Sequence, residues 1–435
     1  MEADMDKRRS SCWALRMLGA VLCVNFLFIQ GPLGRTRDGK EILAALSWGD
    51  QIGFLPGDKP LLTSEKFTRQ FREYKEVGVD TVLFRLDVLR WVREYNWPEP
   101  RLHYKNAPPE IVEYDQKQWA GAHQGVKENL LARIVDIAHE QGLRIFAYST
   151  TFDEGMPLTE NWYAPGESGQ IDPNTKKAFY FKHGLISPMI SKFTEAHPEC
   201  VMVDRSQKKH NWGTLEFACP EARSYAVGYN RWYLENYPFD GVYIDFRNEF
   251  SHPEFGDQFG FGKPIVDEYK RRYGVDILRE QFDLEKWRRL CGEYLTQFIR
   301  ELGRMVMSRK KEFLVGIPQG DYLGLPNSNM HVDWRTWARE RLVDGLVIGV
   351  ITGKFIFPER VGYGYLTDME DDIGLPNILW DLQNNYWPLC AQHRVKLYVR
   401  PDRGTKIPAV QFLRTNVDGL YIPATYSADL LKELR

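Results

Sequence analysis

The stretch FDGVYIDFRNEF, residues 239–250, decides the fold expected for this chain. It opens on Asp-Gly, continues as an apolar strand and ends in charged residues of both signs. Side chains alternate along a strand, so Val242 and Ile244 share one face. Asp245 and Arg247 share the opposite face, which would point into the interior of a barrel. Charges at the end of a buried strand can reach water or substrate, so the stretch is interpreted as a strand that carries functional groups to its carboxyl end.

The same pattern repeats along the chain. Short apolar segments bounded by amphipathic helices are expected to form buried parallel strands. Five of them contain a glycine or an Asp-Gly pair before the apolar run, which suits the left-handed residue that ends a helix. The expected strands are 41–48, 78–87, 141–150, 239–248, 312–320, 343–352, 395–402 and 417–426. Eight strands alternating with helices predict an α/β protein with the (β/α)8 TIM-barrel fold in a single domain.

Helices are expected between these strands, and two connections are long. The helical segments with apolar residues at three- and four-residue spacing are 126–141, 221–237, 284–310, 333–342, 378–393 and 427–435. The connections 88–124 and 151–220, after the second and third strands, are too long for turns and would build the substrate site. A doubly wound open sheet is the alternative, but no G-x-G-x-x-G motif or P-loop follows any strand.

The N-terminus has the pattern of a targeting segment. Lys7, Arg8 and Arg9 precede an apolar run over 17–29, after which the chain turns polar. This pattern predicts a signal peptide or an N-terminal membrane anchor over 1–37 and the barrel domain over 38–435. A secreted or periplasmic location is expected, with membrane contact only through such an anchor.

Composition restricts the partners. The 57 basic and 59 acidic residues give a formal net charge of −2, which offers no electrostatic case for nucleic acid. The 13 Trp and 22 Tyr could fill a core or line a groove on which sugar rings stack. No histidine or cysteine spacing suggests a metal site, and no motif suggests a cofactor. Export would permit a disulfide between Cys200 and Cys219, although free thiols remain equally open.

Polar residues gather where the expected strands end, which is where barrel enzymes place catalytic groups. The candidate catalytic carboxylates are Asp245, Glu249, Asp321 and Asp402. The candidate substrate-binding residues are Trp48, Arg85, Asp87, Tyr148, Arg247, His252, Gln319, Tyr398 and Arg400. The pairs Arg85–Asp87 and Arg400–Asp402 are equally compatible with ion pairs that only hold the rim together.

Several carboxylates at one mouth suit glycoside hydrolysis. One carboxylic acid protonates the leaving oxygen while a second carboxylate attacks the anomeric carbon or activates water. Serine-hydrolase chemistry is disfavoured because no G-x-S-x-G motif is present. A poly- or oligosaccharide is the expected substrate, and the arginines at the mouth suggest an acidic sugar. The alternative is a carbohydrate-binding barrel without catalytic activity.

Two stretches, AHPECVMVDRSQKK (196–209) and LEFACPEARSYAVGYNRWYLENYPFDGVYIDFRNE (215–249), resemble a glycosyl-hydrolase-like barrel family of hypothetical bacterial glycoside hydrolases. The matching residues are His197, Pro198, Glu199, Asp204, Cys219, Pro220, Asp240, Gly241 and Asp245. The resemblance implies a (β/α)8 barrel and sugar chemistry. DGVYIDFRNE is also similar to the strand-four nucleophile motif of α-glucosidase-type barrels, which implies a catalytic role for Asp245. Asn248-Glu249 resembles the Asn-Glu acid/base pair of another glycosidase clan, in which Asp402 would replace a strand-seven glutamate.

Overall fold

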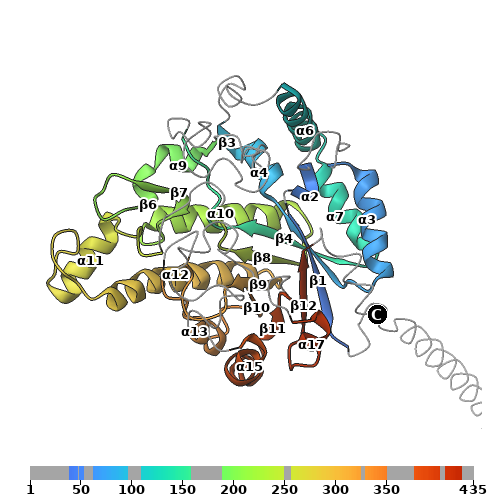
Figure 1. The fold of residues 1–435 in the computed structure, drawn as a ribbon. Helices are drawn as coiled ribbons and strands as arrows, with labels where there is room; N and C mark the ends of the chain where they lie inside the picture. Colours follow the sequence, from blue (N-terminus) through green and yellow to red (C-terminus); the bar gives the residue numbers. More distant parts are fainter. Residues whose placement is uncertain are drawn as a thin grey trace, which may run out of the picture.

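The computed structural model describes residues 39–47, 49–52, 62–96, 109–157, 189–248, 256–324, 329–349, 377–401 and 407–423. Eight parallel strands form a closed barrel, which confirms the predicted fold class and all eight predicted strands (Figure 1). They are β1 (Glu41–Leu46), β2 (Thr81–Arg85), β4 (Arg144–Thr150), β8 (Gly241–Asp245), β9 (Glu312–Ile317), β10 (Gly345–Ile348), β11 (Lys396–Val399) and β12 (Gly419–Pro423). The barrel closes because β1 pairs in parallel with both β2 and β12.

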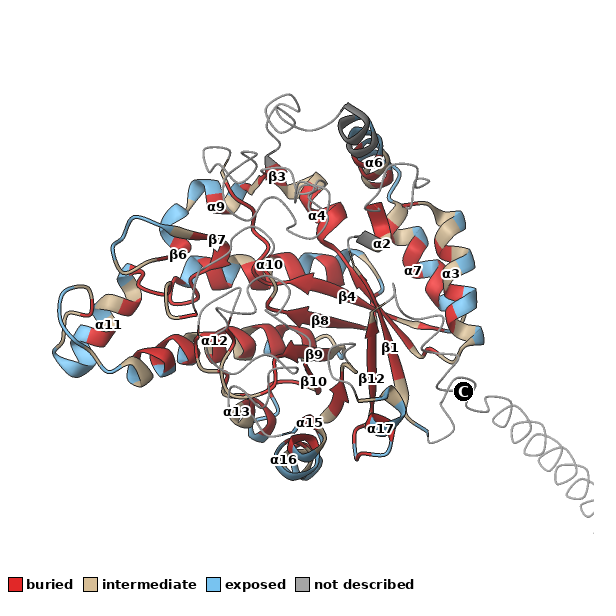
Figure 2. Cartoon of the chain, in the orientation of Figure 1, coloured by how far each residue is buried: buried red, intermediate tan, exposed pale blue. Residues whose placement is uncertain are grey.

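Helices surround the barrel, and the strands beneath them are almost wholly buried (Figure 2). The main ones are α3 (Ser64–Glu76), α7 (Leu130–Glu140), α10 (Pro220–Asn236), α11 (Lys263–Tyr273), α12 (Leu284–Met307), α13 (Trp334–Arg339), α16 (Trp387–His393) and α17 (Ala409–Leu413). The segment 126–141, predicted as one helix, contains the end of α6 (Pro109–Lys127) and all of α7. Asn129 separates them because its φ of 54° interrupts the helical backbone. The helix predicted at 427–435 lies outside the described residues.

Two apolar layers follow from side-chain alternation. Val242 and Ile244 pack into the large core between strands and helices, while Tyr243 points into the barrel, as predicted for this strand. The barrel interior is filled by Leu43, Ala45, Leu83, Phe146, Tyr148, Tyr243, Leu314, Val347, Tyr398 and Tyr421.

Among the described residues, no helix is long and apolar enough to cross a membrane.

Four aspartates at the amino end of the barrel join the strands in pairs. The four aspartates lie directly before β2, β8, β10 and β12. Each one contacts the second residue of the barrel strand that precedes its own strand. Its Oδ2 accepts the N–H of that residue, and its own N–H donates to the same residue's carbonyl. The pairs are Asp80 with Ile42, Asp240 with Ile145, Asp344 with Phe313, and Asp418 with Leu397, with Oδ2–N distances of 2.8–2.9 Å. We call these four residues the aspartate clamps.

The glycines of the Asp-Gly pairs have a different role from the one predicted. Gly78 and Gly142 do adopt positive φ after helices, as expected. Gly241, Gly345 and Gly419 instead begin strands and have no positive φ. A Cβ on Gly241 would lie 2.5 Å from the Phe146 ring, and one on Gly419 would lie 2.1 Å from the Glu41 carbonyl oxygen. These glycines leave room for the neighbouring strand inside a narrow barrel.

A ring of alternating charges closes the same end. Arg144 contacts Glu312 at 2.7 Å and Glu41 at 3.2 Å, and Lys396 contacts Glu41 at 3.1 Å. The Tyr398 hydroxyl donates to Glu41 Oε2 at 2.6 Å. The prediction that Tyr398 lies at the carboxyl-terminal mouth is therefore wrong, because its inward side chain reaches down to the opposite end of the barrel.

The two long connections pack against each other. The first contains α4 (Asp87–Glu94) and β3 (Tyr95–Asn96), and the second contains β5 (Ile190–Ser191), which pairs with β3. The second also contains α9 (Lys192–Ala196) and a hairpin of β6 (Val201–Val203) and β7 (His210–Leu215). A disulfide joins Cys200 to Cys219 with a Cα–Cα distance of 5.6 Å, which confirms the predicted pairing, and Cys291 and Cys390 are free and buried.

Replacing one clamp should test its contribution to stability. Asp344→Ala leaves the Phe313 N–H without its acceptor, and we expect the free energy of unfolding to fall by about 1–3 kcal/mol. Asp344→Asn keeps an acceptor oxygen and should cost clearly less. Urea unfolding followed by circular dichroism measures both. Equal losses for the two variants would show that charge, rather than the hydrogen bond, matters here.

Removing the disulfide should destabilise the hairpin and the start of α10. The sequence separation of 19 residues predicts a loss of roughly 3 kcal/mol on reduction or in Cys200→Ser/Cys219→Ser. The melting temperature with and without a reducing agent measures this loss. The double variant should not respond to the reductant, and an unchanged melting temperature in reduced wild-type protein would contradict the expectation.

Candidate active site

The candidate site lies at the carboxyl ends of β2, β4 and β8, which are neighbours in the barrel. Parallel pairing places Arg85 beside Tyr148, and Thr150 beside Asp245. Side chains paired in register on parallel strands point to the same side, so these four residues all face the barrel interior near its mouth. The sequence predicted three of them, and Thr150 was missed because a threonine in a strand carries no functional signal by itself.

Asp245 is held through one of its two oxygens. Its carboxyl group is fully buried, and Oδ2 accepts a hydrogen bond from the Tyr148 hydroxyl at 2.7 Å and an ion pair from Arg247 Nε at 2.9 Å. Oδ1 has no hydrogen-bond partner among the described residues. Burial raises the pKa of Asp245, while Arg247, Arg85 and the Tyr148 hydroxyl each lower it in part. The arrangement fixes the direction of the carboxylate and leaves Oδ1 as its one oxygen without a partner among the described residues.

Arg85 and Asp87 form a buried ion pair, which is the structural alternative that the sequence left open. The guanidinium also contacts Asp153 Oδ2 at 2.5 Å, and all three side chains are buried. Thr150 Oγ1 donates within this group, lying 2.5 Å from Asp87 Oδ2 and 3.1 Å from Asp153 Oδ2. These contacts make Arg85 and Asp87 neighbours of Asp245 that shape its electrostatics, rather than exposed groups that meet a substrate directly.

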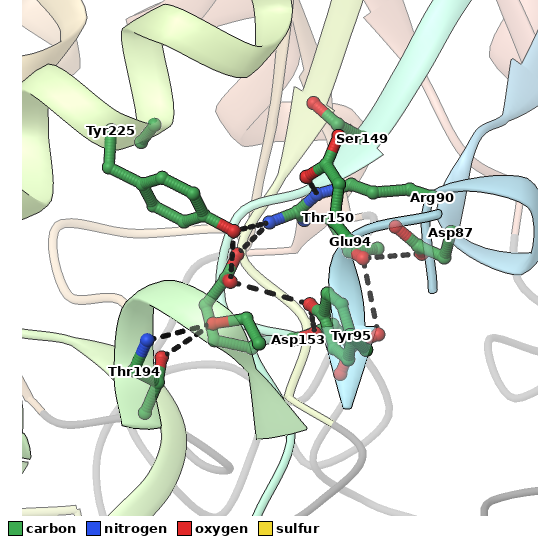
Figure 3. A network of polar contacts seen from close by, with 12 residues as sticks. Asp87, Arg90, Glu94, Tyr95, Ser149, Thr150, Asp153, Thr194 and Tyr225 are labelled. Atoms are coloured by element: carbon green, nitrogen blue, oxygen red, sulfur yellow. Dashed lines mark hydrogen bonds and ion pairs between the residues drawn. The ribbon is translucent and has the colours of Figure 1, made fainter. Parts of the chain in front are cut away.

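A second buried arginine, Arg90, belongs to the polar network drawn in Figure 3 and was not predicted. Arg90, on α4, pairs with Glu154 and donates to the Tyr225 hydroxyl at 2.8 Å. Its guanidinium lies 3.8 Å from the centre of the Tyr229 ring. The Tyr95 hydroxyl donates to the Asp153 carbonyl at 2.6 Å and so connects this group to the first. Arg90 sits inside a helical pattern, and nothing in its local sequence marks it as buried.

A separate polar group lies beyond the end of β9. Asp321 Oδ1 accepts from Trp334 Nε1 at 3.0 Å and from Arg335 at 2.6 Å, and its side chain is 39% exposed. Gln319 is buried and donates to Asp381 Oδ2 at 2.9 Å. Asp381, on α15 (Ile378–Asp381), was not predicted, and burial raises its pKa.

The remaining candidates fall into two groups. Glu249, Asp402, Trp48 and His252 lie outside the described residues. Arg400 is partly buried directly after β11, and its N–H donates to the Ile348 carbonyl at 2.9 Å.

Asn248 is buried and its side-chain amide donates to the Trp212 carbonyl at 2.8 Å and to Thr214 Oγ1 at 2.7 Å, so it ties the end of β8 to the β6–β7 hairpin.

Among the described residues, Cys200, Cys219 and Glu221 form one cluster of potential metal ligands. Its two cysteines are joined in the disulfide. The cluster lies at the start of α10, and none of its members contacts the Asp245 carboxylate.

A (β/α)8 barrel with buried carboxylates at the carboxyl ends of its strands is the class of protein that the fold and site define. Residues 172–360 match the family model described as Glycosyl hydrolase-like 10. The match includes both stretches on which the resemblance was based, so the chain matches a glycosyl-hydrolase-like (β/α)8 family, as predicted. This match supports a function of the glycoside-hydrolase type.

Solved structures are similar to the chain only in outline. The catalytic domain of β-amylase from Paenibacillus polymyxa has a TM-score of 0.41 and 9% identity over 88% of this chain and 92% of its own. The GH36 α-galactosidase AgaB from Geobacillus stearothermophilus has a TM-score of 0.42 and 10% identity over 92% of this chain and 42% of its own.

A β-galactosidase from the psychrophilic Marinomonas ef1 has a TM-score of 0.34 and 9% identity over 71% of this chain and 40% of its own. The chain thus spans about two fifths of the length of the two galactosidases. No curated protein matches the sequence. The assignment of the fold rests on the closed strand order of this chain.

Tyr148→Phe should raise the pKa of Asp245 further, because the lost hydroxyl stabilises the charged carboxylate. The loss of folding stability in Tyr148→Phe relative to wild type should grow as pH rises through the pKa of Asp245. The missing hydrogen bond matters only once the Asp245 carboxyl group is ionised. Tyr243→Phe is the matched control, because the Tyr243 hydroxyl is buried without a hydrogen-bond partner among the described residues. Carbon-13 NMR of labelled aspartate and unfolding between about pH 4 and about pH 8 measure both effects. If Asp245 titrates identically in Tyr148→Phe and Tyr243→Phe, the hydrogen bond between Tyr148 and Asp245 is contradicted.

Proposed function

We propose that this protein is an exported glycoside hydrolase that cleaves a poly- or oligosaccharide, with Asp245 as its central catalytic carboxylate. The observation that carries the proposal is the asymmetry of Asp245 at the end of the fourth barrel strand. Tyr148 and Arg247 hold Oδ2, and Oδ1 has no partner among the described residues. A fixed, buried carboxylate oxygen can attack an anomeric carbon or take a proton from water at low reorganisation cost.

The reaction needs a second carboxyl group as proton donor. Of the candidates Glu249, Asp321 and Asp402, the structure describes only Asp321. Its Oδ1 is held by Trp334 and Arg335, as Asp245 is held through Oδ2, and no described residue bonds its other oxygen. Asp321 is therefore the first of the three to test. Roughly 5 Å between the two reacting carboxyl groups would favour a retaining mechanism, and roughly 6.5–9.5 Å an inverting one.

Two further parts of the proposal have their own support. Arg247 and Arg335 remain 25% and 38% exposed at the mouth, which would favour a substrate with carboxylate or sulfate groups. Export is supported by the apolar run over 17–29 and by the Cys200–Cys219 disulfide, since disulfides persist in oxidising compartments. Both points are independent of which residue donates the proton.

A barrel that binds carbohydrate without cleaving it is the second candidate. It is favoured by the ion pair between Asp245 and Arg247, which neutralises the carboxylate that would react. The two candidates differ in one observable. A hydrolase releases reducing ends from its glycan during incubation. A binding barrel leaves the glycan intact, and the protein binds the incubated glycan with unchanged affinity.

Asp245→Asn keeps the size of the side chain and removes the reacting oxygen. With a substrate found by screening the purified protein on glycans and aryl glycosides, turnover should fall by several orders of magnitude. Asp344→Asn, the same change at the opposite end of the barrel, is the matched control and should retain most of its turnover. If Asp245→Asn keeps most of its activity while its stability falls, the residue is only an ion-pair partner of Arg247.

A further inference from the structure

Glu216 is a buried carboxylic acid that the proposed chemistry does not use. It follows β7 in the second long connection, and its side chain is 2% exposed. Its N–H donates to the Cys200 carbonyl at 2.7 Å, and its carbonyl accepts from Cys219 at 2.9 Å. The backbone of Glu216 is therefore held between the two cysteines of the disulfide.

Among the described residues, no cation lies where it could balance a charge on the Glu216 carboxyl group. No lysine, arginine or histidine among the described residues forms an ion pair with it. Its best hydrogen bond is a long one, 3.5 Å from the Ala218 N–H to Oε1, and Oε2 has no hydrogen-bond partner among the described residues. An ionised carboxylate in such a place loses its hydration without compensation, so the neutral acid is the form that this environment favours.

The segment 256–262 covers this carboxyl group. A Cβ on Gly262 would lie 3.3 Å from Glu216 Oε2, so the segment leaves no room for a water between them. The N–H groups of Gly260 and Phe261 both donate to the Val203 carbonyl, at 3.1 Å and 3.0 Å. Phe261 stacks on Trp287 of α12 with ring centres 4.7 Å apart. The segment thus packs between the β6–β7 hairpin and α12, with Glu216 underneath.

The other titratable groups around Glu216 do not supply the missing charge. From α12, the Cys291 thiol is neutral, and its pKa is raised by burial and then by the negative charges of Glu216 and Asp257. Asp257, in the covering segment, is paired with Arg288 at 2.5 Å. The nearby Ala218 and Gly262 N–H dipoles lower the pKa of Glu216 in part, without a hydrogen bond to Oε2, but burial is the larger effect and raises it to about 7.

We propose that Glu216 is a pH-dependent latch that holds the segment 256–262 against the β6–β7 hairpin when neutral and releases it when ionised. The segment is part of the connection that follows β8 and Asp245 in the chain, so the latch acts on the connection after the candidate catalytic strand. The inference goes beyond the proposed glycoside hydrolysis and does not depend on it.

The direction of the pH effect follows from the raised pKa of Glu216. The contribution of this residue to stability is fully present below its unfolded pKa of about 4.5 and is lost progressively as pH rises to about 7. Between about pH 5.5 and about pH 8.5 the opening equilibrium of the segment should increase about 30-fold, if the carboxyl ionises freely in the open state.

Hydrogen exchange of the Gly260 and Phe261 amides in the full chain measures this opening. After correction for the intrinsic rate, exchange in the wild type should accelerate about 30-fold over this pH range. Glu216→Gln, which cannot ionise, should exchange slowly at both pH values. Glu221→Gln is the matched control, because Glu221 is an exposed carboxylate five positions along the chain and should leave the wild-type pH dependence unchanged.

A titration of the wild type alone keeps the proposal testable if Glu216→Gln does not fold. Carbon-13 NMR of labelled glutamate should show one carboxyl group that titrates near pH 7. The proposal is overturned if no glutamate titrates above about pH 6, or if Glu216→Gln and wild type show the same pH dependence of exchange. Neither outcome depends on finding a substrate.

Discussion

The barrel depends on the four aspartate clamps at its amino end. A parallel strand pair leaves N–H groups without partners where the strands begin, and buried N–H groups without partners are costly. Each clamp supplies the missing acceptor and also donates its own N–H to the same residue, so the two strands are fixed in register. The registers of β1 with β2, β4 with β8, β9 with β10, and β11 with β12 are thereby set at one end.

The positions at the mouth follow from this register. Because side chains alternate strictly along a strand, a shift of β8 by one residue would turn Asp245 outward into the helix layer, away from Tyr148. The clamp formed by Asp240 and Ile145 fixes β8 against β4, and five residues later the same alignment places Asp245 beside Thr150. Contacts at one end of the barrel therefore determine which groups meet at the other.

The mouth contains more buried charge than stability alone would favour. Asp87, Asp153 and Asp245 lie near the guanidinium groups of Arg85 and Arg247, and burying such charges usually gains little or nothing over apolar residues. What the network provides is a single orientation for each member. Tyr148 and Arg247 leave Asp245 with one occupied oxygen, and the pair formed by Arg90 and Glu154 anchors the surrounding connections through tyrosine hydroxyls. A site that must hold a carboxylate in one direction can accept this cost.

The sequence by itself determined the strands, their inward faces and the end of the barrel at which polar groups collect. It did so because these depend on local patterns: alternation along FDGVYIDF and the Asp-Gly pairs are visible without any long-range contact. Tertiary structure decided what those groups do. Arg85 and Asp87 became a buried pair because Thr150 and Asp153, from the end of β4, pack against them. Tyr398 reached Glu41 because an inward tyrosine can extend to either end. Asp381, Arg90 and Glu216 carry no local signal, since their burial comes from segments far away in the chain that pack over them.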